Sequence, residues 1–294
     1  MDSPLATVLL PAALAIVMLG LGLSLTVGDF ARVGRQPKAV VIALLLQLLV
    51  LPAVCFGLVL AFDLPPILAV GMLLLAASPG GTTANLFSHL FRGDVALNVT
   101  LTAVNSLIAV LTLPVITNLA IGYFDPADAD TLGLQFGKTV QVFAVVLVPV
   151  AIGMLVRRRA ARFADRMDKP VRILSAVVLA LVIVGTMLAE RENITGYLRD
   201  IGLPALLFCA LSLLVGFLVP RALGVVERQA VASAFEIGIH NSTLAIAVAI
   251  SVLGSVELAV PAAVYGVLMF PVAAVFGWAI TRTSRRRGSE LPVG

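Results

Sequence analysis

Long apolar stretches separated by short polar segments run along most of the chain. A helix that crosses the hydrocarbon core of a bilayer needs about 20 residues, and scanning with that length predicts nine spans. They cover residues 5–27, 38–61, 66–91, 95–121, 132–157, 171–189, 202–220, 229–254 and 259–281. The pattern predicts an all-α polytopic membrane protein, a single transmembrane unit over residues 1–294 that ends in a basic tail at 282–294. The run at 5–27 is too long for a signal peptide, so we expect it to be retained.

Composition supports this class. The chain is 60% hydrophobic and 12% charged, whereas soluble domains carry about a quarter charged residues. The net charge of +4 does not indicate nucleic acid, because the basic residues lie in short loops between apolar runs. The expected partner is the lipid bilayer, with no nucleic acid, and the sequence leaves the oligomeric state open.

The basic residues also predict orientation. Seventeen of the 20 lie in alternate segments, at 28–38, 92–94, 157–172, 221–228 and 282–294. Lys138, Arg191 and Arg199 fall on the opposite side. The positive-inside rule therefore predicts a multi-pass protein of the cell membrane with its N-terminus outside and its C-terminus in the cytoplasm.

Two predicted spans are interrupted. Span 66–91 contains Ser78-Pro79-Gly80-Gly81-Thr82, in which proline and glycine oppose a continuous helix. Span 229–254 contains the polar run from Glu236 to Thr243. Asn85 and Ser242 are 157 residues apart, and so are Pro114 and Pro271. We therefore expect the first four spans to recur, inverted, as the last four. Broken helices at matching positions of inverted repeats indicate a transporter's binding site.

Glu236 is the only acidic residue well inside a predicted span. A charge at the bilayer centre costs about 2.5–3.5 kcal/mol on insertion scales, so it normally faces a cavity, a cation or a partner. Oxygen-bearing side chains are predicted at similar depth: Gln47, Thr82, Thr83, Asn85, Asn98, Thr102, Asn105, Asn241, Ser242 and Thr243. Carboxylate, amide and hydroxyl oxygens suit a hard cation, and sodium fits this set.

His240 follows Glu236 by four residues, one helical turn, so we expect both side chains on the same helical face. Such a pair can form a salt bridge, part of a metal site or a proton relay. A zinc site is not expected, because no further His or Cys is placed to complete it. Cys55 and Cys209 lie in apolar runs and are expected to be buried free thiols.

These motifs resemble the bile acid:sodium symporter family over essentially the whole chain. The resemblance rests on Ser78-Pro79-Gly80-Gly81-Thr82 with Asn85, on Arg92-Gly93-Asp94-Val95-Ala96-Leu97, on Glu236-Ile237-Gly238-Ile239-His240-Asn241-Ser242, and on Gly20-Leu21-Gly22-Leu23-Ser24-Leu25 with Asp29-Phe30. It implies a panel domain of spans 5–27, 132–157 and 171–189. It also implies a core domain, residues 38–121 and 202–281, in which two discontinuous helices cross.

The resemblance also implies site residues. One sodium site would use Asn85, Thr102 and Glu236, with Asn98 where the family often has serine; Ala84 replaces another serine ligand. A second site would use Gln47, Glu236 and the backbone near Ile237 and Ile239. His240 stands where that site usually has a glutamine, and an imidazole nitrogen is a poorer sodium ligand than an amide oxygen.

The sequence therefore predicts a secondary active transporter, not an enzyme, that couples sodium to a small or amphipathic organic anion by alternating access. Sodium is the only cofactor expected, and Thr82, Thr83, Asn241 and Ser242 are candidate substrate contacts. Because of His240, a proton-coupled or uncoupled organic-anion permease is the alternative. An intramembrane enzyme with Glu236 and His240 as acid and base lacks a nucleophile or cofactor motif. A receptor or channel fits paired broken helices less well, and an arsenite-type permease is disfavoured because neither broken span contains cysteine.

Overall fold

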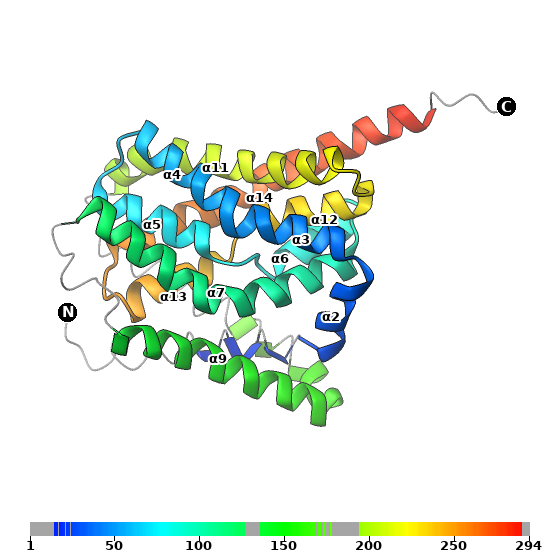
Figure 1. Ribbon diagram of the computed structural model, residues 1–294, viewed down its shortest axis with the longest axis horizontal. Helices are drawn as coiled ribbons and strands as arrows, with labels where there is room; N and C mark the ends of the chain where they lie inside the picture. The colour runs from blue at the N-terminus through cyan, green and yellow to red at the C-terminus, as the bar shows by residue number, and fades with distance from the viewer. Residues whose placement is uncertain are drawn as a thin grey trace.

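The structure is a computed structural model that describes residues 15–16, 18–20, 22–23, 25–126, 136–167, 170–171, 173–174, 177 and 194–289. Over these residues the regular elements are helical (Figure 1), as the sequence predicts. They are α2 (Val27–Ala31), η1 (Arg32–Arg35), α3 (Pro37–Leu45), η2 (Leu46–Val50), α4 (Leu51–Ala61), α5 (Pro66–Ala77), α6 (Thr83–Leu90), α7 (Val95–Phe124), α9 (Phe136–Arg159), α11 (Ile194–Ala222), α12 (Glu227–Gly238), α13 (Ser242–Ser251), η3 (Glu257–Ala259) and α14 (Val260–Ser289).

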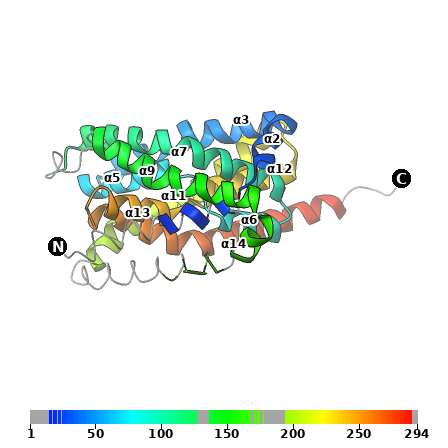
Figure 2. The same ribbon diagram turned by 90° about the horizontal axis from the view of Figure 1, so that it is seen from below.

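Four helices within this part are long and apolar enough to cross a membrane, namely Pro37–Ala61, Val95–Phe124, Arg199–Ala222 and Glu257–Arg282. They match predicted spans 38–61, 95–121, 202–220 and 259–281. The two interrupted spans each form a pair of shorter helices, and α9 covers the described part of span 132–157. Most of spans 5–27 and 171–189 lies outside the described residues, so the total of nine stays a prediction. The helices lie side by side along the long axis, with α9 along one side of the bundle (Figures 1 and 2).

The helix Pro37–Ala61 widens in its middle. Its residues Leu46–Val50 form a π-helical turn just before Pro52. Proline has no N–H to donate to the carbonyl four residues earlier, so the turn before it loses a hydrogen bond and opens more easily. Gln47 lies in this turn and is buried at 2% exposure.

The two predicted interruptions are real and they pair with each other. Helix α5 ends at Ala77, before Pro79, and α12 ends at Gly238. The N–H of Gly81 donates to the carbonyl of Ile239 at 2.7 Å, and the N–H of Asn241 donates to the carbonyl of Pro79 at 2.8 Å. These bonds form an antiparallel β-bridge between Gly80 and His240. Each break therefore satisfies backbone groups that the other frees inside the bundle.

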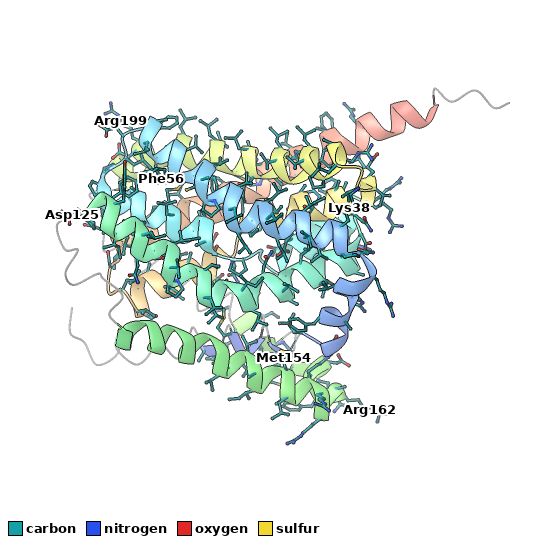
Figure 3. All side chains as sticks on the ribbon, in the orientation of Figure 1. Lys38, Phe56, Asp125, Met154, Arg162 and Arg199 are labelled. Carbon is teal, nitrogen blue, oxygen red and sulfur yellow. The ribbon has the colours of Figure 1, made fainter. Side chains whose placement is uncertain are left out.

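The ends of the bundle differ in charge. Lys38 and Arg162 lie at one end, and Asp125 and Arg199 lie at the other (Figure 3). The turn at 92–94 joins the first end, because Asp94 accepts from Gln36 and its N–H donates to the carbonyl of Arg228. We call this the basic end. The segments that contain Lys38, Arg92, Arg162 and Arg228 thus lie at the same end, as expected for segments that the sequence assigns to one side of the membrane.

Candidate functional site

Glu236 lies in the last turn of α12 and is fully buried. Its Oε2 accepts hydrogen bonds from Thr102 Oγ1 at 2.6 Å and Asn98 Nδ2 at 3.2 Å. Its Oε1 accepts from Asn105 Nδ2 at 3.2 Å. Among the described residues no Lys, Arg or His forms an ion pair with this carboxylate. It is therefore surrounded by neutral donors inside the bundle.

One face of α7 supplies all three donors. Asn98, Thr102 and Asn105 are spaced by four and three residues, so they lie in a row along the helix. All three are buried, and Asn98 also donates to the carbonyl of Ala232 at 3.0 Å. Asp94 caps the start of α7 by accepting from Leu97 N at 3.0 Å, which fixes where this helix begins.

The other side of the carboxylate is closed by the first break. A Cβ placed on Gly80 would lie 2.3 Å from both Cδ and Oε1 of Glu236. Real Cβ atoms essentially never come so close to another atom, so only glycine lets the backbone approach here. The carboxylate is thus enclosed between α7 and the paired breaks.

Several oxygens in and near this cluster have no donor. In the described part of the chain, Gln47 Oε1, Asn85 Oδ1, Asn98 Oδ1 and Asn105 Oδ1 are buried without a hydrogen-bond partner. Buried amide oxygens are normally paired, and each exception needs an explanation. An amide oxygen that accepts no hydrogen bond is free to coordinate a hard cation.

Gln47 and His240 both contact one backbone carbonyl of the first helix break, that of Ser78. Gln47 Nε2 donates to the carbonyl of Ser78 at 3.0 Å, and His240 Nδ1 lies 3.2 Å from the same oxygen. A carbonyl only accepts, so this contact requires the proton on Nδ1. The remaining nitrogen, His240 Nε2, is buried and has no partner among the described residues.

His240 does not share a helical face with Glu236. Helix α12 ends at Gly238, and Ile239 leaves the helical conformation with φ −114° and ψ 82°. This turns the imidazole into an aromatic slot, where it stacks on Phe208 at 5.4 Å between ring centroids and lies edge-on to Tyr265 at 5.5 Å. The prediction that both side chains share a helical face is wrong, because the four-residue spacing has this meaning only in an unbroken helix.

The remaining predicted residues lie at the starts of α6 and α13. Thr82 is exposed at the N-cap of α6, and Thr83 is its first residue. Asn241 caps α13 by accepting from Leu244 N at 3.0 Å, and Ser242 begins that helix. Asn85 lies in the first turn of α6, and no hydrogen bond joins it to Glu236 in the described structure.

Sequence reasoning missed two members of this site. Asn105 appears there only as one oxygen-bearing side chain among many, although its spacing from Asn98 and Thr102 could have placed it on the same face. The close approach of Gly80 to Glu236 depends on how two distant segments meet, and no local pattern carries it. Among the described residues no group of three His, Cys, Asp or Glu could hold a metal ion, and Cys55 and Cys209 are buried free thiols.

Comparison with known proteins identifies relatives of this chain among sodium-dependent transporters. A sequence model of the Sodium Bile acid symporter family matches residues 11–197. The chain is 28% identical to "Uncharacterized sodium-dependent transporter YocS" of Bacillus subtilis, over 86% of this chain and 77% of that protein. It is 32% identical to "Probable sodium/metabolite cotransporter BASS1, chloroplastic" of Arabidopsis thaliana, over 86% and 62% of the two chains.

A human relative, "Sodium/bile acid cotransporter 4", is 33% identical over 64% of this chain and 44% of that protein. The chain therefore spans less than two thirds of the length of the plant and human relatives. All three relatives are named as transporters and none as an enzyme. The chain belongs to the sodium bile acid symporter family, a family of sodium-dependent membrane transporters.

Proposed function

We propose that this protein is a secondary active transporter that couples sodium to the uptake of a small or amphipathic organic anion. The observation that carries the proposal is the buried Glu236 carboxylate, which has no basic partner among the residues that the structure describes. An isolated buried charge is strongly unfavourable. A sodium ion would supply the missing positive charge, and the unpaired amide oxygens around it supply further ligands.

The first sodium site would consist of Glu236, Thr102 and Asn98, with Asn85 on the neighbouring half-helix. Thr102 Oγ1 and Glu236 Oε2 are already 2.6 Å apart, and the oxygens of Asn85 and Asn98 are buried and unpaired. Small rotations of these side chains would turn oxygens towards a shared ion. Gln47 and His240 would contribute to a second site on the other side of the Ser78 carbonyl.

The transported anion would bind next to the starts of α6 and α13. Helix N-termini carry partial positive charge and free N–H groups, which favour an anion. Thr82, Thr83, Asn241 and Ser242 lie at these two starts. The bound cation would be close by on the carboxylate, so each ion would favour binding of the other.

Transport would proceed by alternating access within an inverted-repeat fold of nine spans. The panel, spans 5–27, 132–157 and 171–189, would move against the core, residues 38–121 and 202–281. Contact between Gly22 and Val150, where a Cβ on the glycine would lie 2.2 Å from the carbonyl oxygen, supports grouping the first span with α9. The charge difference between the two ends supports a cytoplasmic basic end and C-terminus, with the N-terminus outside.

Sodium-dependent thermal stability of the purified protein tests the cation site without knowledge of the substrate. We expect sodium, but not potassium or choline, to raise the Tm of the wild type, and Glu236→Gln to abolish this rise. Ser255→Ala, outside the site, is the control. A Tm that responds to sodium equally in wild type and Glu236→Gln would rule out coupling through this residue. Uptake of candidate organic anions into proteoliposomes under a sodium gradient would then test symport.

His240 favours a second candidate, a permease that is coupled to one sodium ion or to protons. Its imidazole stands where the family pattern implies a glutamine amide, and its Nδ1 already donates to the carbonyl of Ser78. In proteoliposomes, uptake driven by a pH gradient in the absence of sodium would support this candidate. Uptake that follows only the sodium gradient at every pH would exclude proton coupling.

A further inference from the structure

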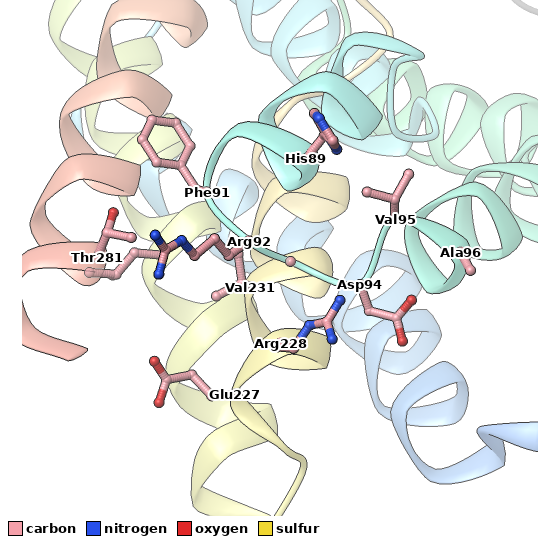
Figure 4. A pocket seen from close by; sticks show the side chains of 12 residues that line it. His89, Phe91, Arg92, Asp94, Val95, Ala96, Glu227, Arg228, Val231 and Thr281 are labelled. Atoms are coloured by element: carbon pink, nitrogen blue, oxygen red, sulfur yellow. The ribbon is translucent and has the colours of Figure 1, made fainter. Parts of the chain in front are cut away.

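A cavity of about 860 Å³ opens at the basic end (Figure 4), and Glu236 does not line it. Its walls come from the end of α6, the turn at 91–94, the starts of α7 and α12, and Ile280 and Thr281 of α14. Two arginines, Arg92 and Arg228, and two carboxylates, Asp94 and Glu227, share it with the apolar side chains of Phe91 and Val231. The lining therefore brings guanidinium groups next to apolar side chains, the combination that an amphipathic anion needs, provided that the carboxylates are held by other groups.

The two carboxylates of the cavity have hydrogen-bond or ion-pair partners outside it, whereas its two arginines form no ion pair among the described residues. Asp94 Oδ1 accepts from Leu97 N and Asp94 Oδ2 accepts from Gln36 Nε2, each at 3.0 Å. Glu227 Oε2 lies 3.7 Å from Arg221 Nη2. Neither Arg92 nor Arg228 forms an ion pair within the described part of the chain. The guanidinium group of Arg92 lies on the Thr281 side of the cavity, and that of Arg228 lies on the Asp94 side (Figure 4).

Arg92 holds its position at a conformational cost. Its φ of 62° lies in the left-handed region, which side chains other than glycine and asparagine rarely adopt. The next residue, Gly93, packs against α12, where a Cβ would meet Val231 Cγ1 at 3.1 Å. Arg92 follows the C-cap of α6, and Gly93 N–H donates to the Ser88 carbonyl at 2.7 Å, so this backbone closes the end of the helix and holds Arg92 in the wall of the cavity.

Residues typical of the membrane–water interface lie beside the cavity. Trp278 is 54% exposed on α14, and the Arg282 guanidinium lies 4.0 Å from its ring centroid. Tryptophan concentrates at membrane–water interfaces, and Thr281 of the cavity is the neighbour of Arg282 on the same helix. Leu86 and Leu90 on α6 are 55% and 59% exposed, so apolar surface continues from this helix towards the hydrocarbon.

We propose that the cavity binds the phosphodiester headgroup of an anionic phospholipid, with Arg92 and Arg228 as phosphate ligands. Guanidinium forks match phosphate oxygens. Anionic lipids are enriched in the cytoplasmic leaflet, which the basic end faces in the orientation proposed above. Phe91 and Val231 contact the glycerol and the upper acyl chain. Because α12 carries Arg228 near its start and Glu236 near its end, the bound lipid stabilises the half-helix that holds the carboxylate.

The test uses the full-length protein in neutral detergent and follows Tm while dioctanoyl phosphatidylglycerol is added. Dioctanoyl phosphatidylcholine and inorganic phosphate are added in separate titrations. We expect saturable stabilisation by phosphatidylglycerol alone. Arg92→Gly combined with Arg228→Gln should weaken its apparent affinity by at least about tenfold, because glycine accepts the left-handed backbone while both phosphate ligands are lost. Arg35→Gln, which removes an exposed basic residue outside the cavity, should leave the affinity unchanged.

Equal affinity in the double variant and the wild type would overturn the proposal, and so would equal stabilisation by phosphatidylcholine. Inorganic phosphate binding as tightly as phosphatidylglycerol would show a soluble-anion site and overturn the lipid assignment. Arg228→Gln alone, an exposed change in the first turn of α12, should weaken binding severalfold and keeps the test decisive if the double variant does not fold. The readout needs neither sodium nor a transported substrate, so its failure is distinct from failure of the proposed transport function.

Discussion

The backbone of Gly80 lies directly against the carboxylate of Glu236, although the two residues are 156 positions apart in the chain. A Cβ on Gly80 would lie 2.3 Å from Oε1 and 2.6 Å from Oε2. The break in the first discontinuous helix therefore forms one wall of the space in which the carboxylate is held, and the residue at this wall must have no side chain.

Gly80→Ala should weaken sodium binding by at least about tenfold, since the added methyl group displaces the carboxylate from its donors on α7. The midpoint of sodium-dependent thermal stabilisation measures this change. Gly57→Ala is the matched control, because a Cβ on Gly57 meets nothing within 4 Å. An unchanged midpoint in Gly80→Ala would show that the carboxylate does not bind the ion at this wall.

Asn105→Leu keeps nearly the same volume and removes the amide that donates to Glu236 Oε1. We expect sodium affinity to fall by about tenfold, because the variant loses the donor that positions Oε1 and also the unpaired Oδ1 that could coordinate the ion. Thr112→Val is the control on the same helix, since this hydroxyl bonds only the local carbonyl of Ile108. If both variants respond to sodium like the wild type, Asn105 has no part in ion binding.

His240→Gln restores an amide oxygen beside Gln47. We expect the sodium dependence of uptake to become steeper, with a Hill coefficient nearer two, because an amide oxygen coordinates sodium better than an imidazole nitrogen. Uptake into proteoliposomes as a function of sodium concentration measures this. His89→Gln, outside the cluster, serves as control, and an unchanged Hill coefficient would mean that residue 240 does not limit the second site.

Tyr265→Phe should destabilise the protein by about 0.6–1.5 kcal/mol. Tyr265 is fully buried, and its hydroxyl donates to the carbonyl of Gly238 at 2.9 Å, where α12 ends. Hydrogen bonds inside membrane proteins contribute about this much. Thermal unfolding in detergent should show a lower Tm, whereas Tyr123→Phe, at a 61% exposed position, should not change it. Equal Tm values for the two variants would show that the Gly238 carbonyl finds another donor.

The sequence predicted those features that depend on neighbours along the chain. Pro79 with Gly80 and Gly81 cannot continue a helix, and the polar run after Glu236 is hard to bury in one, so both interruptions were visible. Glu236 stood out because a carboxylate is costly in hydrocarbon. The shared face of Asn98, Thr102 and Asn105 could also be predicted from the sequence, since the three residues repeat at helical spacing.

Contacts between distant segments could not be predicted in this way. The position of His240 depends on the β-bridge with Gly80, which forms only when the two breaks meet. The π-helical turn at Gln47 is set by Pro52 together with packing, and its pairing with Ser78 joins segments 31 residues apart. Helical periodicity describes a single element, and these features arise between elements.

The bridge between the breaks is made entirely of main-chain atoms. Substitutions at its outer positions can therefore change which groups face the ion without dismantling the junction, provided that no bulk is added at Gly80. The main-chain hydrogen bonds hold the junction in place, whichever side chains surround it. Exchange of His240 for glutamine is one such substitution, and we expect it to change ion preference while the fold stays the same.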